Sequence, residues 1–317
     1  MTEVKQSAGG SVNKRVNFTY RTGGGYLTGQ GNRLLSDGTY IYQYDAEGNR
    51  TARFVDVDLD GQLSAGDTDV TAYAWDYRNR LVEVTERAVE GGAATQVVAY
   101  SYDASDRRIQ RTLDSDGDGT PEDYRYQVHR GGEAALELSD PDGLEGQTYE
   151  PALAHRYLYG AAVDQILAVE DDSGDVLWGL ADHQGTIRDV IDSAASLVQH
   201  RKYDSFGNAD VTPIADFLFA YTGRPLNVET GLYDYRARWY DAGVGRFVSE
   251  DPLGFAAGDM NSYRYVGNSP LDYTDPTGMS SFSGVLTKKI ELGPPIHLSL
   301  DQLQTADESL RLPIAPG

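Results

Sequence analysis

Closely spaced carboxylates near the start of the sequence have the spacing of a calcium-binding loop. Residues 56–67 carry acidic side chains at loop positions 1, 3, 5 and 12, glycine at position 6 and a hydroxyl at position 9. This is the pattern of an EF-hand loop, with Asp in place of the usual final Glu. Three carboxylates so close together repel one another unless a cation lies between them. The sequence therefore predicts a calcium site, with a solvated acidic turn as the alternative, and its expected ligands are Asp56, Asp58, Asp60, Gln62 (through its backbone carbonyl), Ser64 and Asp67.

A second acidic loop repeats the first half of this pattern. Asp114, Asp116, Asp118 and Thr120 occupy the early ligand positions, but position 12 is Arg125. We expect Glu122 or Asp123 to complete the calcium shell from a shorter loop. Neither loop is flanked by amphipathic helices, so both are predicted to be structural clips in a β protein rather than parts of a calcium sensor.

The elements that carry these loops are predicted to be β-hairpins. An aromatic residue followed by Asp, a short turn and Arg recurs at Tyr44-Asp45, Trp75-Asp76 and Tyr102-Asp103, and in diverged form at Tyr203-Asp204. Tyrosines that alternate with other residues place their rings on one face of a strand, and Asp with Gly or Asn is turn chemistry. We expect these rings to pack between successive hairpins.

The predicted fold class is mainly β, with antiparallel hairpins stacked into a curled sheet or partial barrel. A single hairpin cannot bury its own apolar face, so the units must stack. Between Tyr20 and Asn268, the stretches that could be helical are Ala161 to Val169 and Ile187 to Val198.

Composition excludes several classes of function. The formal charge is −22 and there is no cysteine, which argues against binding to a nucleic-acid backbone and excludes disulfides and thiol catalysis. No run approaches the roughly 18 apolar residues of a membrane helix. The first ten residues lack the apolar core of a signal peptide, so we expect either another export route or a longer parent protein.

The sequence from Trp178 onward carries an ordered series of motifs. They are Asp182-His183-Gln184-Gly185, Tyr203-Asp204-Ser205-Phe206-Gly207, Tyr221-Thr222-Gly223-Arg224, Glu229-Thr230-Gly231-Leu232-Tyr233-Asp234-Tyr235-Arg236-Ala237-Arg238-Trp239-Tyr240-Asp241, Gly245-Arg246-Phe247, Asp251-Pro252-Leu253-Gly254, Tyr263-Arg264-Tyr265-Val266-Gly267-Asn268 and Asp275-Pro276-Thr277-Gly278. This series resembles the Rhs repeat-associated core domain, and the preceding hairpins resemble the YD repeats of Rhs and wall-associated polymorphic toxins.

The resemblance implies a β-strand shell that is closed by the core domain and encloses a variable C-terminal cargo. It further implies an intramolecular aspartyl protease in which Asp251 and Asp275 are the two acids and the Met279–Ser280 bond is cut. Two carboxylates within hydrogen-bond reach can divide the roles of general acid and general base. Arg246 is a candidate for pairing with one of them. The alternative is that both Asp-Pro motifs are turns with no catalytic role.

Four regions are therefore expected: a polar, Gly-rich segment (1–30), the YD-repeat sheet (31–177), the Rhs core domain (178–279) and a variable tail (280–317), in which residues 299–312 could form a weak amphipathic helix. The expected partners are the chain's own C-terminal segment or an upstream YD-repeat shell, and a cell-surface or immunity protein. The expected location is outside the cell or at its surface, as part of a larger system. The competing function is a non-catalytic, calcium-stabilised β-repeat module for surface adhesion or cell contact.

Overall fold

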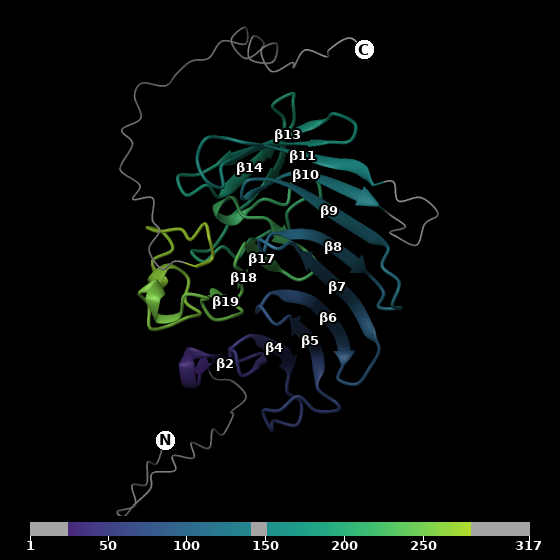
Figure 1. The fold of residues 1–317 in the computed structure, drawn as a ribbon. Coiled ribbons are helices and arrows are strands. Elements are labelled where there is room, and N and C mark those ends of the chain that lie inside the picture. Colours follow the sequence, from purple (N-terminus) through teal and green to yellow (C-terminus); the bar gives the residue numbers. More distant parts are fainter. Residues whose placement is uncertain (1–24, 141–150, 280–317) are drawn as a thin grey trace, which may run out of the picture. The chain divides into compact units, whose positions relative to one another are not determined.

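The computed structural model describes residues 25–140 and 151–279, and these residues form strands and turns with four short 3₁₀ turns (Figure 1). The main element is a 15-stranded antiparallel sheet whose strand order is the sequence order. Its strands are β1 (Leu27–Thr28), β2 (Leu34–Ser36), β3 (Ile41–Tyr44), β4 (Arg50–Val55), β5 (Thr68–Trp75), β6 (Leu81–Val89), β7 (Ala94–Tyr102), β8 (Arg108–Asp114), β9 (Asp123–Arg130), β10 (Glu133–Asp140), β11 (Ala152–Tyr159), β12 (Ile166–Asp171), β13 (Val176–Ala181), β14 (Ile187–Ile191) and β15 (Leu197–His200).

A second, four-stranded sheet follows, in the order β16-β17-β18-β19. Its strands are β16 (Leu226–Asn227), β17 (Leu232–Tyr235), β18 (Arg238–Asp241) and β19 (Arg246–Phe247), and the 3₁₀ turns are η1 (Gln30–Asn32), η3 (Tyr221–Gly223), η4 (Gly254–Ala257) and η5 (Val266–Asn268). The large sheet is not closed into a barrel, because β1 and β15 are its two edge strands. The predicted mainly antiparallel β fold is confirmed.

The two stretches proposed as helical are strands in the structure. β12 occupies the second part of the apolar run that begins at Ala161, and β14 and β15 occupy the two ends of the run that begins at Ile187. Short apolar runs fit a buried strand as well as a buried helix, and pairing with neighbouring strands decides between them. The predicted boundary between residues 177 and 178 falls inside β13, so the repeat region and the core region share one sheet. The predicted tail helix lies outside the described residues.

The turn aspartates bond to the backbone in the same way in successive units. At Asp76 one carboxylate oxygen accepts the amides two and four residues ahead, those of Arg78 (2.8 Å) and Arg80 (3.0 Å). The same bonds recur at Asp103, and also at Asp171, Asp182 and Asp192, where no aromatic residue precedes the aspartate. The aspartate alone therefore defines the turn.

Aromatic residues link one hairpin to the next. Trp75 Nε1 donates to the carbonyl of Arg50 (2.7 Å), and Tyr102 Oη donates to the carbonyl of Leu81 (2.7 Å). Both carbonyls belong to the fifth residue after the turn aspartate of the preceding unit. The Arg80 guanidinium also lies over the Tyr102 ring, 4.9 Å from its centroid. The predicted packing of the rings between hairpins is therefore observed.

Acidification is expected to weaken these turns. The Arg107 side chain and backbone amides lower the pKa of Asp103, and hydrogen bonds from Arg80 outweigh burial to lower the pKa of Asp76. Because the unfolded carboxylates bind protons more readily, their stabilising effect is present above about pH 4 and is lost as the pH falls through the folded values. Urea unfolding at several pH values between pH 3 and pH 7 should show that the free energy of unfolding falls with the pH. This fall should be smaller in Asp76→Asn, and an equally large fall in that variant would contradict the prediction.

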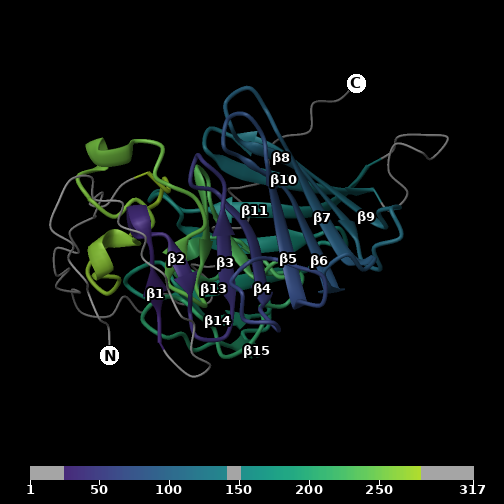
Figure 2. The same ribbon diagram turned by 90° about the horizontal axis from the view of Figure 1, so that it is seen from below.

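The small sheet packs against one face of the large sheet. Tyr73, Val84 and Tyr100 of the large sheet form a buried cluster with Leu232 and Trp239 of the small one. Figure 2 shows how strands β3 to β8 of the large sheet follow one another. The curl of the large sheet thus brings residues from distant repeats onto one inner surface.

None of the helices within the described ranges has the length and apolar character of a membrane span.

Candidate functional site

The two acids of the Asp-Pro motifs meet at one arginine. Arg238, the first residue of β18, places Nη2 2.8 Å from Asp251 Oδ2 and 3.4 Å from Asp275 Oδ2. All three residues are buried, and Asp275 is 0% exposed. The acids are 24 positions apart in the sequence, and in the fold both contact the same guanidinium.

Each acid also shapes its own turn. Asp251 Oδ1 accepts the amide of Leu253 (2.9 Å), and Asp275 Oδ1 accepts the amides of Thr277 (3.2 Å) and Gly278 (2.9 Å). Each carboxylate can therefore stabilise its own turn and contact Arg238 at the same time, because Oδ1 accepts the turn amides and Oδ2 faces Arg238.

Arg238 is held from several sides. Its Nη1 donates to the Ser262 carbonyl (2.8 Å), its Nε donates to the Gly278 carbonyl, and its guanidinium lies 3.6 Å from the centroid of the Phe247 ring. Burial lowers the pKa of Arg238 to about 10, although the two carboxylates oppose the shift. Arg238 therefore stays charged at neutral pH and offsets the repulsion between the acids.

Arg238 takes the place that sequence reasoning gave to Arg246. Arg246 Nη1 instead donates to the carbonyl of Asn32 (2.8 Å). In the small sheet Phe247 pairs with Tyr240, and Arg246 pairs with Asp241. Side chains alternate between faces along a strand, so Phe247 shares a face with Arg238 while Arg246 points to the opposite one. No spacing in the sequence distinguishes Arg238 from Arg246, because the choice depends on which face of the small sheet each residue occupies.

The turn before the expected cut site packs tightly on the β17–β18 hairpin. Gly278 has a φ of +68°, and a Cβ at this position would lie 2.3 Å from the Tyr235 carbonyl oxygen. The Thr277 carbonyl also accepts the amide of Ala237 (3.3 Å). Only glycine fits this close approach without displacement of the turn. Met279 is half-buried and is the last described residue. Ser280, on the other side of the bond that is expected to be cut, lies outside the described residues.

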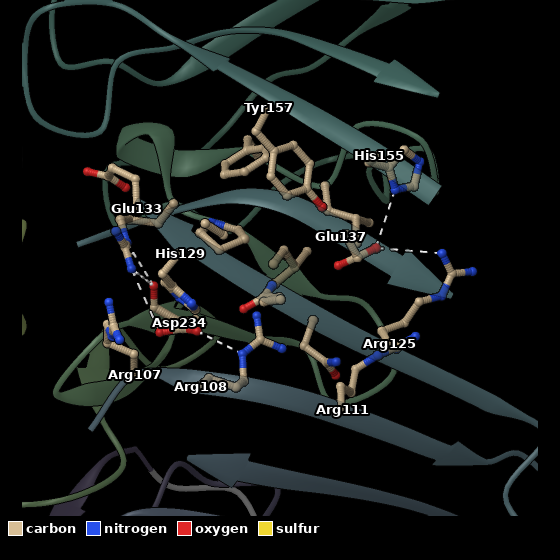
Figure 3. Close-up of a pocket in the computed structure, with 18 of the residues that line it drawn as sticks. Arg107, Arg108, Arg111, Arg125, His129, Glu133, Glu137, His155, Tyr157 and Asp234 are labelled. Atoms are coloured by element: carbon tan, nitrogen blue, oxygen red, sulfur yellow. Dashed lines mark hydrogen bonds and ion pairs between the residues drawn. The ribbon is translucent and has the colours of Figure 1, made fainter. Parts of the chain in front are cut away.

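A cavity of about 930 Å³ adjoins this turn (Figure 3). Thr277 and Met279 belong to its lining, whereas Asp251 and Asp275 do not. The rest of the wall is built by the inner faces of β8 to β11 and by residues that precede and form the small sheet. Met279, the residue before the expected cut, therefore lies at the edge of this cavity.

Paired charges line this cavity. Arg108 Nε lies 3.0 Å from Asp234 Oδ2, and His155 Nδ1 lies 3.3 Å from Glu137 Oε1, as Figure 3 shows. Burial alone would raise the pKa of Glu137, but the hydrogen bond with His155 and the charge of Arg125 lower it. Burial lowers the pKa of His129, and Arg107 adds to that effect. Charged side chains in the wall thus form ion pairs with one another.

The acidic loops gather most of their predicted calcium ligands. Asp56, Asp58 and Asp60 bring one carboxylate oxygen each to within 4.8 Å of one another, and so does a second group, Asp114, Asp116, Asp118 and Glu122. Ser64 Oγ donates to Asp58 Oδ2 (3.2 Å), and the amides of Gln62 and Thr120 bond to Asp60 and Asp118. Both groups offer the hard oxygen ligands that calcium prefers.

Two of the predicted acidic ligands lie outside these groups. Asp67 accepts the amides of Val57 (2.9 Å) and Ser64 (2.8 Å), so both of its oxygens close the loop through backbone bonds. Asp123 forms ion pairs with Arg111 and Arg125 instead (2.8 Å to Arg125). Glu122 therefore belongs to the second acidic group and Asp123 does not, and the first group has three clustered carboxylates rather than four.

Comparison with known proteins matches most of the chain to one family model. The model described as Teneurin YD-shell matches residues 13–271. The tRNA3(Ser)-specific nuclease WapA of Bacillus spizizenii is 27% identical over 285 residues, which cover 88% of this chain and 10% of that protein. The toxin protein Tse5 of Pseudomonas aeruginosa is 29% identical over 289 residues, which cover 78% of this chain and 19% of that protein.

Solved structures share the fold. The crystal structure of TcdB2-TccC3-TEV superposes with a TM-score of 0.53 at 18% identity, and the match covers 75% of this chain and 13% of that one. The chain thus spans a small part of the proteins that it matches.

Proposed function

The chain belongs to the teneurin YD-shell family as an Rhs/YD-repeat protein, and on that premise we propose that it is part of a toxin shell that cuts its own chain after Met279. Asp251 and Asp275 are the two acids of this reaction. The shell part scaffolds and then releases the segment that follows, and the protein acts outside the cell or at its surface. Its partners are its own C-terminal segment and further YD-repeat strands, with an immunity or cell-surface protein as a third class.

The convergence of Asp251 and Asp275 on Arg238 is the observation that supports this proposal most. Burying two carboxylates together is unfavourable unless a cation and hydrogen bonds compensate. The same arginine holds the Gly278 carbonyl, one residue before the bond to be cut. A purely structural pair of turns would not need both acids to face one guanidinium beside that residue.

The proposed reaction is hydrolysis of one peptide bond. The water oxygen bonds to the carbonyl carbon of Met279, and the bond from that carbon to the Ser280 nitrogen breaks. One of the two carboxylates takes a proton from the water, and the other, as the acid, gives a proton to the leaving nitrogen. The products are a carboxylate on Met279 and an amine on Ser280. Arg238 keeps the two acids and the preceding carbonyl in fixed positions.

Intact mass of the purified full chain tests this proposal. Hydrolysis after Met279 gives two fragments whose masses sum to that of the chain plus one water. A chain that stays at its full mass after long incubation at several pH values would support the non-catalytic scaffold or adhesion function instead.

We also propose that the two acidic loops bind calcium as structural clips. Each would hold the ion between carboxylates that already lie within 4.8 Å of one another. A ligand that binds the folded state at 100 times its Kd stabilises that state by about 2.7 kcal/mol. We therefore expect EDTA to lower the melting temperature and added calcium to restore it.

Matched variants separate calcium binding from a general effect of charge. Asp58→Asn and Asp116→Asn should each reduce the response to calcium, whereas Glu47→Gln, an exposed acid outside both loops, should keep it. A melting temperature that EDTA leaves unchanged would rule out calcium binding at both loops.

A further inference from the structure

Arg236 connects the turn before the expected cut site to the large sheet. Its Nη1 donates to the carbonyl of Pro276, between the second catalytic acid and Gly278. Its Nη2 lies 2.7 Å from Glu133 Oε1 of β10 and 2.6 Å from Asp164 Oδ1. One guanidinium therefore joins three segments that are distant in the sequence.

The backbone at Arg236 is held in an uncommon conformation. Its φ is +63°, in the left-handed region where glycine or asparagine is usual. The Arg236 amide donates to Asp234 Oδ1 (2.8 Å), which fixes the tight turn between β17 and β18. A long charged side chain at a position that favours glycine points to a role for that side chain.

The acids that hold Arg236 are themselves fixed. Asp164 is 7% exposed and also pairs with Arg224 (2.8 Å), whose pKa is raised because the nearby carboxylates outweigh burial. Glu133 stands at the start of β10, in the wall of the cavity. The anchor of the Pro276 carbonyl is thus part of the large sheet and does not depend on the small sheet alone.

We infer that Arg236 is a positioning residue that fixes the turn at residues 275–278 by tying the Pro276 carbonyl to Glu133 and Asp164. It acts through the turn and contacts neither acid of the proposed reaction in the described contacts. Its effect on cleavage rests on the proposed function, whereas its effect on the order of the turn does not. A planar guanidinium can serve a carbonyl and two carboxylates at once, which a lysine ammonium cannot do in the same geometry.

Amide hydrogen exchange measures the order of the turn in a chain that cannot cut itself. In the Asp251→Asn background, adding Arg236→Gln should speed exchange in peptides covering 275–279 by roughly tenfold or more. Peptides of β5 and β6 should exchange as before. With Arg236→Lys, exchange at 275–279 should be faster than in the Asp251→Asn chain and slower than with Arg236→Gln. Glu133→Gln should also speed this exchange, but it should add nothing once Arg236 is replaced.

Cleavage gives the second measurement. In the otherwise unchanged chain, Arg236→Gln should slow cutting by roughly 10- to 100-fold, because a small displacement of the reacting bond has effects of that size. The exposed Arg78→Gln is the matched control and should leave the rate unchanged. If the unmutated chain does not cut, the proposed function fails while the exchange result still decides the inference. Unchanged exchange at 275–279 in Arg236→Gln, or an equal rise throughout the chain, would overturn it.

Discussion

Asp251→Asn and Asp275→Asn are each expected to leave the bond after Met279 intact. Asparagine keeps the size of the side chain and can still accept the turn amides through its carbonyl oxygen, so each turn should persist. It cannot exchange a proton at neutral pH, and loss of a general acid or base lowers rates by roughly 100- to 10,000-fold. Intact mass after timed incubation measures the fraction cut.

Asp259→Asn is the matched control for these two variants. Asp259 is also buried and paired with an arginine, Arg264 (2.7 Å), but it does not contact Arg238 in the described contacts. We expect this variant to cut as the unmutated chain does. Normal cutting by either Asp251→Asn or Asp275→Asn would remove that residue from the proposed mechanism.

Arg238→Met is expected to produce the largest loss of stability. It leaves two buried carboxylates without their shared cation, and removal of one partner from a buried ion pair costs about 3 to 5 kcal/mol. Urea unfolding measures the change, and the intact mass of each sample identifies which form of the chain is being unfolded. The exposed pair of Arg78 and Asp106 provides the comparison, because Arg78→Met should cost less than about 1 kcal/mol.

A compensating set of substitutions distinguishes charge from packing. Arg238→Met combined with Asp251→Asn and Asp275→Asn removes the cation together with both negative charges, so most of the lost stability should return. If the triple variant stays as unstable as Arg238→Met, the loss comes from the contacts of Arg238 with Phe247 and the backbone carbonyls instead.

Arg238 and Arg236 show how one short motif carries two different roles. The side chain of Arg238 reaches the two acids, and that of Arg236 reaches the large sheet on the other side of the same hairpin turn. Both also bind carbonyls of the second Asp-Pro turn, Gly278 and Pro276 respectively. The hairpin thereby fixes the residues that precede the expected cut site from two directions.

The local features of this protein followed from its sequence. Asp76 and Asp103 define their turns through bonds to amides two and four residues away, and the carboxylates of Asp56, Asp58 and Asp60 gather within one loop. Such contacts form between near neighbours in the chain, so residue type and spacing are enough to predict them. The order of the motifs likewise predicted a pairing of Asp251 and Asp275, and both carboxylates contact Arg238.

Only the tertiary structure decided which arginine joins those acids, that the two stretches that could be helical contain strands, and where the cavity lies. Arg238 and Asp275 are 37 positions apart, and Arg236 and Glu133 are 103 positions apart. Contacts of this kind depend on the curl of a 15-stranded sheet and on the face that each small-sheet residue presents. A shift of one residue in the register of β18 or β19 would exchange Arg238 for a neighbour, and no local pattern in the sequence fixes that register.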